Sequence, residues 1–241
     1  MIHATASIDK NAIIEDGVEI GPFCSISAGV HIHSGCVLHA NVILDGNITL
    51  EENVKIFSFA NLGNGSNTIT VGKETVIREF CIIATDSQVN YPVVIAENNF
   101  VMAYVNLKAG VHLDAHCILT NAVTLSENVH CGEKVIIGGL STIEKDNTIG
   151  TGVMIGGASY ITHDMPPFCL VEGHPAVVKG LNLIGLRRRL PNTDAINEIR
   201  SVYKEIFRTD NVDKESAQQI ASEHQNSYVR QLASFVANSN M

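Results

Sequence analysis

A large aliphatic residue recurs at every sixth position through the first two thirds of the chain. The series starts at Ile2, runs without exception to Leu62, resumes after one change of frame at Val71 and ends at Ile161. This gives 27 sites, with Val89 counted among them and Cys131 at one of them. Six residues of α-helix rotate about 600°, so successive members of this series would lie about 240° apart and share no helical face. The pattern therefore excludes a helix and favours short strands.

The positions two residues before the repeat sites are also restricted in type, and residues two apart on a strand lie on the same face. The first of these positions are small or β-branched, namely Ala6, Ala12, Val18, Cys24, Val30, Cys36 and Val42. The residue after a repeat site is often Gly, Asp, Asn or Glu, which suits a turn. Strands that turn every six residues predict a mainly β fold, a parallel β-helix of hexapeptide repeats with three sides. About nine coils at roughly 4.8 Å each would form a prism about 40 Å long.

Two stretches interrupt the period and are predicted to leave the prism as loops. The first lies between Leu62 and Val71 and contains the polar run Gly63–Asn67. The second is Thr85–Pro92. Loops that extend from a rigid scaffold often carry binding residues.

The six-residue period stops after Ile161, at Asp164–Pro167, and a helical pattern begins near residue 191. One face of the first helix is apolar and another is basic, formed respectively by Ile196, Ile199, Tyr203 and Ile206 and by Arg200, Lys204 and Arg208. Further helices are predicted at residues 213–223 and 226–237. The chain is thus expected to form a β-helix over residues 1–180 and an α-helical domain over residues 181–241, which caps the open end of the prism.

The composition restricts the class of protein. Hydrophobic residues make up 45% and charged residues 17%, which excludes a disordered chain. Acidic residues outnumber basic ones by 25 to 16, and the net charge of -9 makes nucleic acid and anionic membrane surfaces poor partners. No apolar run is long enough for membrane insertion, and the first residues do not resemble a signal peptide, so a cytoplasmic protein is expected.

The cysteines argue against metal binding and disulfide formation. They stand at positions 24, 36, 81, 117, 131 and 169, with no CxxC pair and no histidine at zinc-finger spacing. The sequence therefore predicts no metal site, and in a reducing compartment these residues would be small buried hydrophobic side chains.

The C-terminal third carries a motif more specific than the repeat. Asp164–Pro167 and Gly173 precede Gly180–Arg189, and the helical segment with Ile199 and Tyr203 follows. Through these residues the chain resembles, over nearly its whole length, the UDP-N-acetylglucosamine O-acyltransferases of lipid A biosynthesis. The resemblance implies left-handed coils and a homotrimer with sites between subunits. It also implies a nucleotide-sugar acceptor and, as donor, a phosphopantetheine-linked thioester on an acyl carrier protein or alternatively on coenzyme A, with no separate cofactor.

In that family a histidine acts as general base, removing the proton of the acceptor hydroxyl as it attacks the thioester. The resemblance places this position at Ala109, so the base is absent here. Three other histidine positions of the family's site fall at Ala84, Asn106 and Glu144, and the family's acceptor-binding loop is shortened. The differences therefore occur together across one cleft.

The donor and nucleotide end of the family's site is retained. The matching residues are Asn182, Arg188, Arg189 and the pair of Arg78 and Glu79, and Asn106 is a further substrate-binding candidate. Guanidinium groups bind phosphate through paired hydrogen bonds, which suits a diphosphate or a phosphopantetheine-bearing acidic carrier protein. The basic residues of the first long helix have an equally good interpretation as a face paired with Glu198 and Glu205.

Residues eighteen apart would stack on adjacent coils, and this brings candidate chemistry together. His112 and His130 would form an outward-facing pair that either binds a metal, faces the next subunit, or is plain surface. A column of Lys108, Ser126 and Glu144 would form at one corner, where Glu144 is either a partly desolvated base or part of a salt bridge. His163 follows its repeat site at the same interval as the family's base, several coils further on.

Three functions remain open from the sequence. The chain is a divergent acyltransferase that acts without the histidine base, or a non-catalytic relative that binds a ligand, a partner or an active homologue. A γ-type carbonic anhydrase on the same prism is the third, and it would need three converging histidines where the sequence shows a pair.

Overall fold

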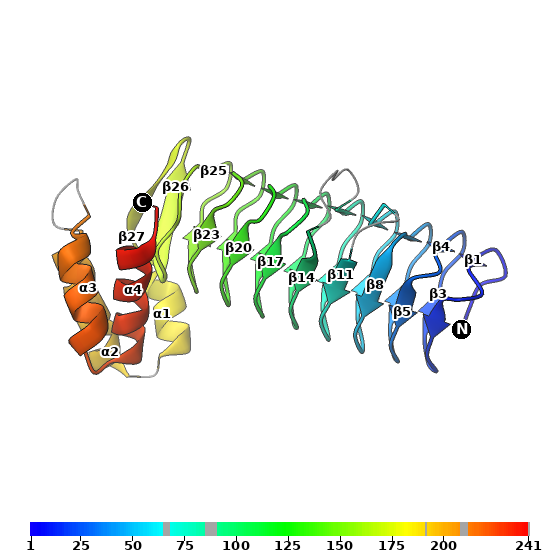
Figure 1. Ribbon diagram of the computed structural model, residues 1–241, viewed down its shortest axis with the longest axis horizontal. Helices are drawn as coiled ribbons and strands as arrows, with labels where there is room; N and C mark the ends of the chain where they lie inside the picture. The colour runs from blue at the N-terminus through cyan, green and yellow to red at the C-terminus, as the bar shows by residue number, and fades with distance from the viewer. Residues whose placement is uncertain (65–67, 85–90, 191, 208–211, 241) are drawn as a thin grey trace.

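The computed structural model describes residues 1–64, 68–84, 91–190, 192–207 and 212–240. Its strands wind around one long axis, and the helices lie together at the C-terminal end (Figure 1). Every third strand belongs to the same sheet, which is the arrangement of a three-sided coil. The predicted parallel β-helix with a C-terminal helical region is therefore confirmed.

The three sheets run the length of the prism. Sheet 1 contains β1 (Ser7–Ile8), β4 (Ser25–Ile26), β7 (Ile43–Leu44), β10 (Asn61–Leu62), β13 (Ile82–Ile83), β16 (Asn106–Leu107), β19 (Thr124–Leu125), β22 (Thr142–Ile143) and β25 (Tyr160–Ile161). Sheet 2 contains β2 (Ile13–Ile14), β5 (Val30–Ile32), β8 (Asn47–Leu50), β11 (Thr68–Val71), β14 (Val93–Ile95), β17 (His112–Leu113), β20 (His130–Cys131) and β23 (Thr148–Ile149). Sheet 3 contains β3 (Glu19–Ile20), β6 (Val37–Leu38), β9 (Lys55–Ile56), β12 (Val76–Ile77), β15 (Phe100–Val101), β18 (Ile118–Leu119), β21 (Ile136–Ile137), β24 (Met154–Ile155), β26 (Cys169–Gly173) and β27 (Ala176–Leu181).

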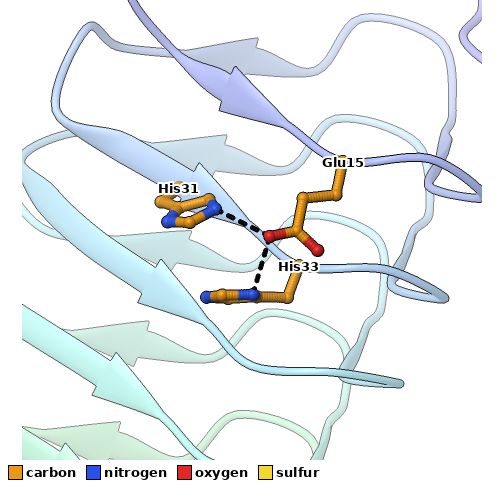
Figure 2. A group of neighbouring side chains, drawn as sticks. All are labelled: Glu15, His31 and His33. Atoms are coloured by element: carbon orange, nitrogen blue, oxygen red, sulfur yellow. Dashed lines mark hydrogen bonds and ion pairs between the residues drawn. The ribbon is translucent and has the colours of Figure 1, made fainter.

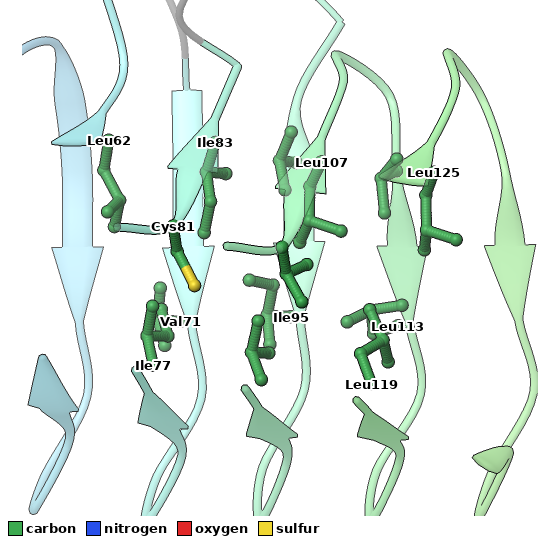
Figure 3. Packing of buried hydrophobic residues seen from close by; sticks show 14 of the residues in the cluster. Leu62, Val71, Ile77, Cys81, Ile83, Ile95, Leu107, Leu113, Leu119 and Leu125 are labelled. Atoms are coloured by element: carbon green, nitrogen blue, oxygen red, sulfur yellow. The ribbon is translucent and has the colours of Figure 1, made fainter. Parts of the chain in front are cut away.

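Strands on successive coils pair in parallel with their repeat sites in register. In sheet 1, for example, Leu107 lies opposite Leu125, which lies opposite Ile143. These side chains point inward and stack with their neighbours to form the core of the prism (Figure 3). Each inward row is fully buried in the central coils, so burial of apolar surface is the main stabilising contribution.

The interruptions change the number of residues in a coil but not the register between strands. Leu62 pairs with Ile83, 21 residues later, and Ile83 pairs with Leu107, 24 residues later. Residues 65–67 and 85–90, which hold most of the two predicted loops, lie outside the described residues. Val89, which is predicted as a repeat site, also lies outside the described residues.

The C-terminal region adds an element that the sequence did not predict. The last strand of the prism, β26, pairs in parallel with β24 and in antiparallel fashion with β27, forming a hairpin that ends at Leu181. Four helices follow: α1 (Leu183–Arg189), α2 (Thr193–Ile206), α3 (Lys214–Glu223) and α4 (Ser227–Asn238). The last two agree with the predicted helices to within one residue at either end.

The helices pack on one another and on the last coil. Ile196, Ile199 and Ile206 of α2 are buried in a second hydrophobic cluster, while Tyr203 contacts both this cluster and the core of the prism. Gln231 of α4 donates a hydrogen bond to the hydroxyl of Thr151 in the prism. The apolar face predicted for α2 is thus buried mainly among the helices, and of its residues Tyr203 also packs on the core of the prism, whereas Arg208 lies outside the described residues.

All six cysteines are free thiols and buried, as the repeat predicted. Burial raises the pKa of Cys81 and of Cys117 to about 12, so neither thiol is ionised near neutral pH. Among the described residues, no helix is both long and apolar enough to cross a membrane.

Candidate active site

The column of Lys108, Ser126 and Glu144 forms as predicted, because each residue follows a strand of sheet 1 that is in register with the next. Glu144 is half-buried, and its carboxylate accepts a hydrogen bond from the hydroxyl of Tyr160 on β25. That hydrogen bond raises the pKa of Tyr160, so the tyrosine remains a donor and holds the carboxylate in place. Sequence reasoning missed Tyr160, although it stands eighteen residues after Thr142, which lies in the same row of sheet 1.

Asn106 is the first residue of β16. It lies in the same row of sheet 1 as Thr142 of β22, two coils before it. Its Oδ1 atom is buried and has no hydrogen-bond partner among the described residues. The Oδ1 atom of Asn61, on β10, is in the same situation. Buried amide oxygens without a donor are unfavourable, so these two atoms mark an unsatisfied part of sheet 1.

An aromatic ladder, formed by Phe59, Phe80 and Tyr104, runs beside these asparagines. Neighbouring rings of the ladder stack with centroids 5.0 Å apart and planes within 2° of parallel. The three side chains are exposed, and each residue has a positive φ of 59–65°, a backbone conformation that bulky residues rarely adopt. Together with Ile43 and Ile82 they line an apolar groove.

Ala109 lies at the corner after β16 and is fully buried. Its methyl group can neither accept nor donate a proton. The site therefore has no general base at the position that the family resemblance assigns to one, and Glu144, two coils further on in the column of Lys108, is a carboxylate candidate.

The residues predicted to bind substrate near the helices have structural partners. Asn182 is the N-cap of α1, accepting from the backbone N–H of Gly185 at 2.9 Å and donating to the carbonyl of Gly152 at 3.1 Å. Arg189 donates to the carbonyl of Lys134 at 3.0 Å, and burial lowers its pKa. Arg188 by contrast is exposed, as is its neighbour Arg187.

A second groove lies between the hairpin and α2. Leu181, Leu183 and Tyr203 form its apolar part, and the exposed side chains of Arg200 and Lys204 form its rim. Within the part of the chain that the structure describes, neither basic residue forms an ion pair. Glu198 instead accepts a hydrogen bond from Asn226, so the pairing proposed for Arg200 does not form.

Arg78 and Glu79 form a bidentate ion pair, with distances of 2.9 Å from Nε to Oε2 and 3.0 Å from Nη2 to Oε1. The guanidinium carbon of Arg78 lies 4.5 Å from the ring centre of Phe57. These contacts hold the side chains of Arg78 and Glu79 in place beside sheet 3.

His112 and His130 stack as predicted, and the structure adds a third group that the sequence analysis missed. Asp114 Oδ1 lies 3.2 Å from Nε2 of His112 and 3.3 Å from Nε2 of His130. The carboxylate takes the place of the third histidine that a γ-type carbonic anhydrase would need, which argues against that function. His163 is half-buried, and its Nδ1 lies 3.2 Å from the hydroxyl of the adjacent Thr162.

Comparison with known proteins accounts for both parts of the chain. Residues 164–241 match the family described as "Udp N-acetylglucosamine O-acyltransferase; Domain 2", and residues 11–46 match the bacterial transferase hexapeptide repeats. The chain is 38% identical to the acyl-[acyl-carrier-protein]–UDP-N-acetylglucosamine O-acyltransferase of Aliarcobacter butzleri, over 98% of this chain and 95% of that protein. The protein of the same name from Sulfurovum sp. is also 38% identical, over 99% and 95% of the two chains.

Solved structures agree with this assignment. LpxA from Acinetobacter baumannii superposes with a TM-score of 0.91 at 33% identity, covering 99% of this chain and 97% of that one. UDP-N-acetylglucosamine acyltransferase from Campylobacter jejuni gives a TM-score of 0.92 at 29% identity, with 99% and 97% covered. The fold is thus the left-handed parallel β-helix, and the chain belongs to the family of acyl-[acyl-carrier-protein]–UDP-N-acetylglucosamine O-acyltransferases.

Proposed function

We propose that this protein transfers an acyl group from an acyl carrier protein to UDP-N-acetylglucosamine or a closely related nucleotide amino-sugar, slowly and without a histidine base. The names of its full-length relatives supply the reaction, and one local observation supports the altered route. Glu144 presents a half-buried carboxylate, held by Tyr160, on the corner column that also carries Lys108, the residue before Ala109. It is the group best placed to accept a proton.

In the proposed reaction the Glu144 carboxylate takes the proton of the acceptor hydroxyl as the oxygen attacks the thioester carbonyl. The new C–O bond forms, the C–S bond breaks, and the thiolate of the phosphopantetheine leaves and takes up a proton. A carboxylate is a weaker base than imidazole at neutral pH, so the step is slower than with a histidine. The retained Arg188 is proposed to contact the phosphate groups of the donor or acceptor.

A binding experiment separates ligand recognition from turnover. Calorimetric titration with UDP-N-acetylglucosamine, and separately with acyl carrier protein, is expected to show binding to the wild-type chain. Arg188→Ala is expected to weaken one of the two about 10- to 100-fold, the effect of losing a hydrogen bond to a charged group. Arg230→Ala, an exposed arginine on α4, is the matched control and should bind normally. Absence of binding by the wild-type chain to both ligands would contradict the proposal.

The non-catalytic alternative is favoured by one feature, the fully buried methyl group of Ala109 where the base would be. It predicts the same binding as the proposal but no turnover. Measured transfer activity therefore decides between the two.

We further propose that the chain forms a homotrimer in which a neighbouring subunit covers the aromatic ladder. The exposed stacked rings and the unpaired buried amide oxygens of Asn61 and Asn106 support an interface on this face. Phe80→Arg would place a charge in that interface and is expected to shift the protein towards monomers in analytical ultracentrifugation. Val177→Arg, at an exposed position of β27, is the control and should leave the assembly intact. Equal sedimentation of both variants and the wild type would contradict this interface.

A further inference from the structure

A second group of titratable side chains lies at the opposite end of the prism from the helices. The Glu15 cluster consists of Glu15, which follows β2 on the first coil, and of His31 and His33 in and after β5 on the second coil. Glu15 Oε1 lies 3.0 Å from Nε2 of His31 and 2.9 Å from Nδ1 of His33 (Figure 2). The two imidazole rings stack with centroids 4.1 Å apart. One carboxylate oxygen and two ring nitrogens therefore converge on one point.

These distances are close to those between neighbouring ligand atoms of a bound metal ion. Two ligand atoms bonded to Zn²⁺ at about 2.1 Å, at angles of about 90–109°, are about 3.0–3.4 Å apart. All three ligand atoms of the Glu15 cluster lie within 4.8 Å of one another. Two imidazoles and one carboxylate favour zinc and similar transition metals over Mg²⁺ or Ca²⁺, which prefer oxygen ligands.

The carboxylate is already oriented and ionised. Its other oxygen, Oε2, accepts a hydrogen bond from the backbone N–H of Ser34 at 3.0 Å, as second-shell donors do for metal ligands. Burial works to raise the pKa of Glu15, but the hydrogen bonds from His31 and Ser34 and the nearby His33 together hold it below its usual range.

We propose that Glu15, His31 and His33 bind one Zn²⁺ ion, with the remaining coordination positions open to water. Because Glu15 belongs to the first coil and both histidines to the second, the ion would join the two coils. This end of the prism needs such a link, since Ile2 is 51% exposed and Ile13 is 57% exposed. The expected effect of the metal is thus to stabilise the N-terminal coil.

The Asp114 cluster, formed by His112, Asp114 and His130, offers an internal comparison. It has the same ligand types in sheet 2, but its distances to the carboxylate are longer, at 3.2 and 3.3 Å, and its rings are tilted by 54° instead of stacked. Its two histidines are also more exposed than those of the Glu15 cluster. Substitutions there provide controls with the same change of chemistry.

The test is a Zn²⁺ titration of the untagged, metal-free protein, with a chromophoric chelator as competitor, together with thermal unfolding. We expect the wild type and Asp114→Asn to bind at least one equivalent and to unfold at a higher temperature with Zn²⁺. Glu15→Gln and His33→Ala should bind one equivalent less and lose that shift. Both replaced side chains are partly exposed, and unchanged circular dichroism of the metal-free variants establishes that they fold. Zinc binding that is equal in all four proteins, or absent from the wild type, would overturn the proposal.

Discussion

Acyl transfer to UDP-N-acetylglucosamine by this chain is expected to be about 10²- to 10⁴-fold slower than by a relative that has the family's histidine. The reason is the substitution by Ala109, whose buried methyl group cannot remove a proton. The measurement is kcat/KM for both proteins with the same acyl carrier protein and acceptor. The Aliarcobacter butzleri relative is a suitable reference if its sequence carries the histidine. A rate equal to that of the reference would show that the missing base has been fully replaced.

The variant Glu144→Gln is expected to lower the remaining rate by a further factor of about 10² or more, because the amide cannot act as a base. Tyr160→Phe removes the hydrogen bond to Glu144 and should give a smaller loss. Glu127→Gln, a half-buried acid one coil away and outside the column, is the matched control and should keep the wild-type rate. If Glu144→Gln also keeps that rate, Glu144 is not the base.

Replacement of Gly138 by alanine is expected to destabilise the prism by at least about 2 kcal/mol. A Cβ atom on Gly138 would lie 2.6 Å from the carbonyl carbon of Gly156 and 2.7 Å from Cα of Gly157, both backbone atoms of the next coil. Backbone in a hydrogen-bonded ladder cannot move aside for it without loss of register. For a chain of this size, the melting temperature should fall by roughly 5–10 °C.

Gly157→Ala is the matched control for this prediction. Its Cβ would lie 3.4 Å from the carbonyl oxygen of Gly139, an ordinary contact, so no comparable loss is expected. Differential scanning calorimetry of the two variants beside the wild type measures the difference. Equal melting temperatures for the two variants would show that the coils are not as tightly spaced as described.

The architecture could be predicted because one physical constraint repeats along the chain. Every described coil places an apolar side chain inward at the repeat site of each side, so the period itself specifies the strands, the sheets and the alignment of residues eighteen apart. The stacking of His112 with His130 followed from this rule. So did the alignment of Ser126 with Glu144.

What the sequence did not predict depends on departures from that period or on packing across elements. The aromatic ladder was not predicted because its members are not eighteen residues apart. Phe59 and Phe80 are separated by 21 residues, and Phe80 and Tyr104 by 24. The Glu15 cluster has a partial signal in the sequence, since Glu15 and His33 are eighteen apart. The use of Asn182 as a helix cap depends on where α1 meets the prism, which no local pattern encodes.

The two interruptions of the period have a consequence for how such proteins diversify. The chain has three or six extra residues at these points, yet the strands on either side pair with their neighbours in the same register as elsewhere. Alignment is thus set by the hydrogen bonds between coils and not by the length of chain that connects them. Corner segments can lengthen, shorten or change chemistry during evolution without moving the scaffold. Recognition of new ligands can therefore arise without loss of stability.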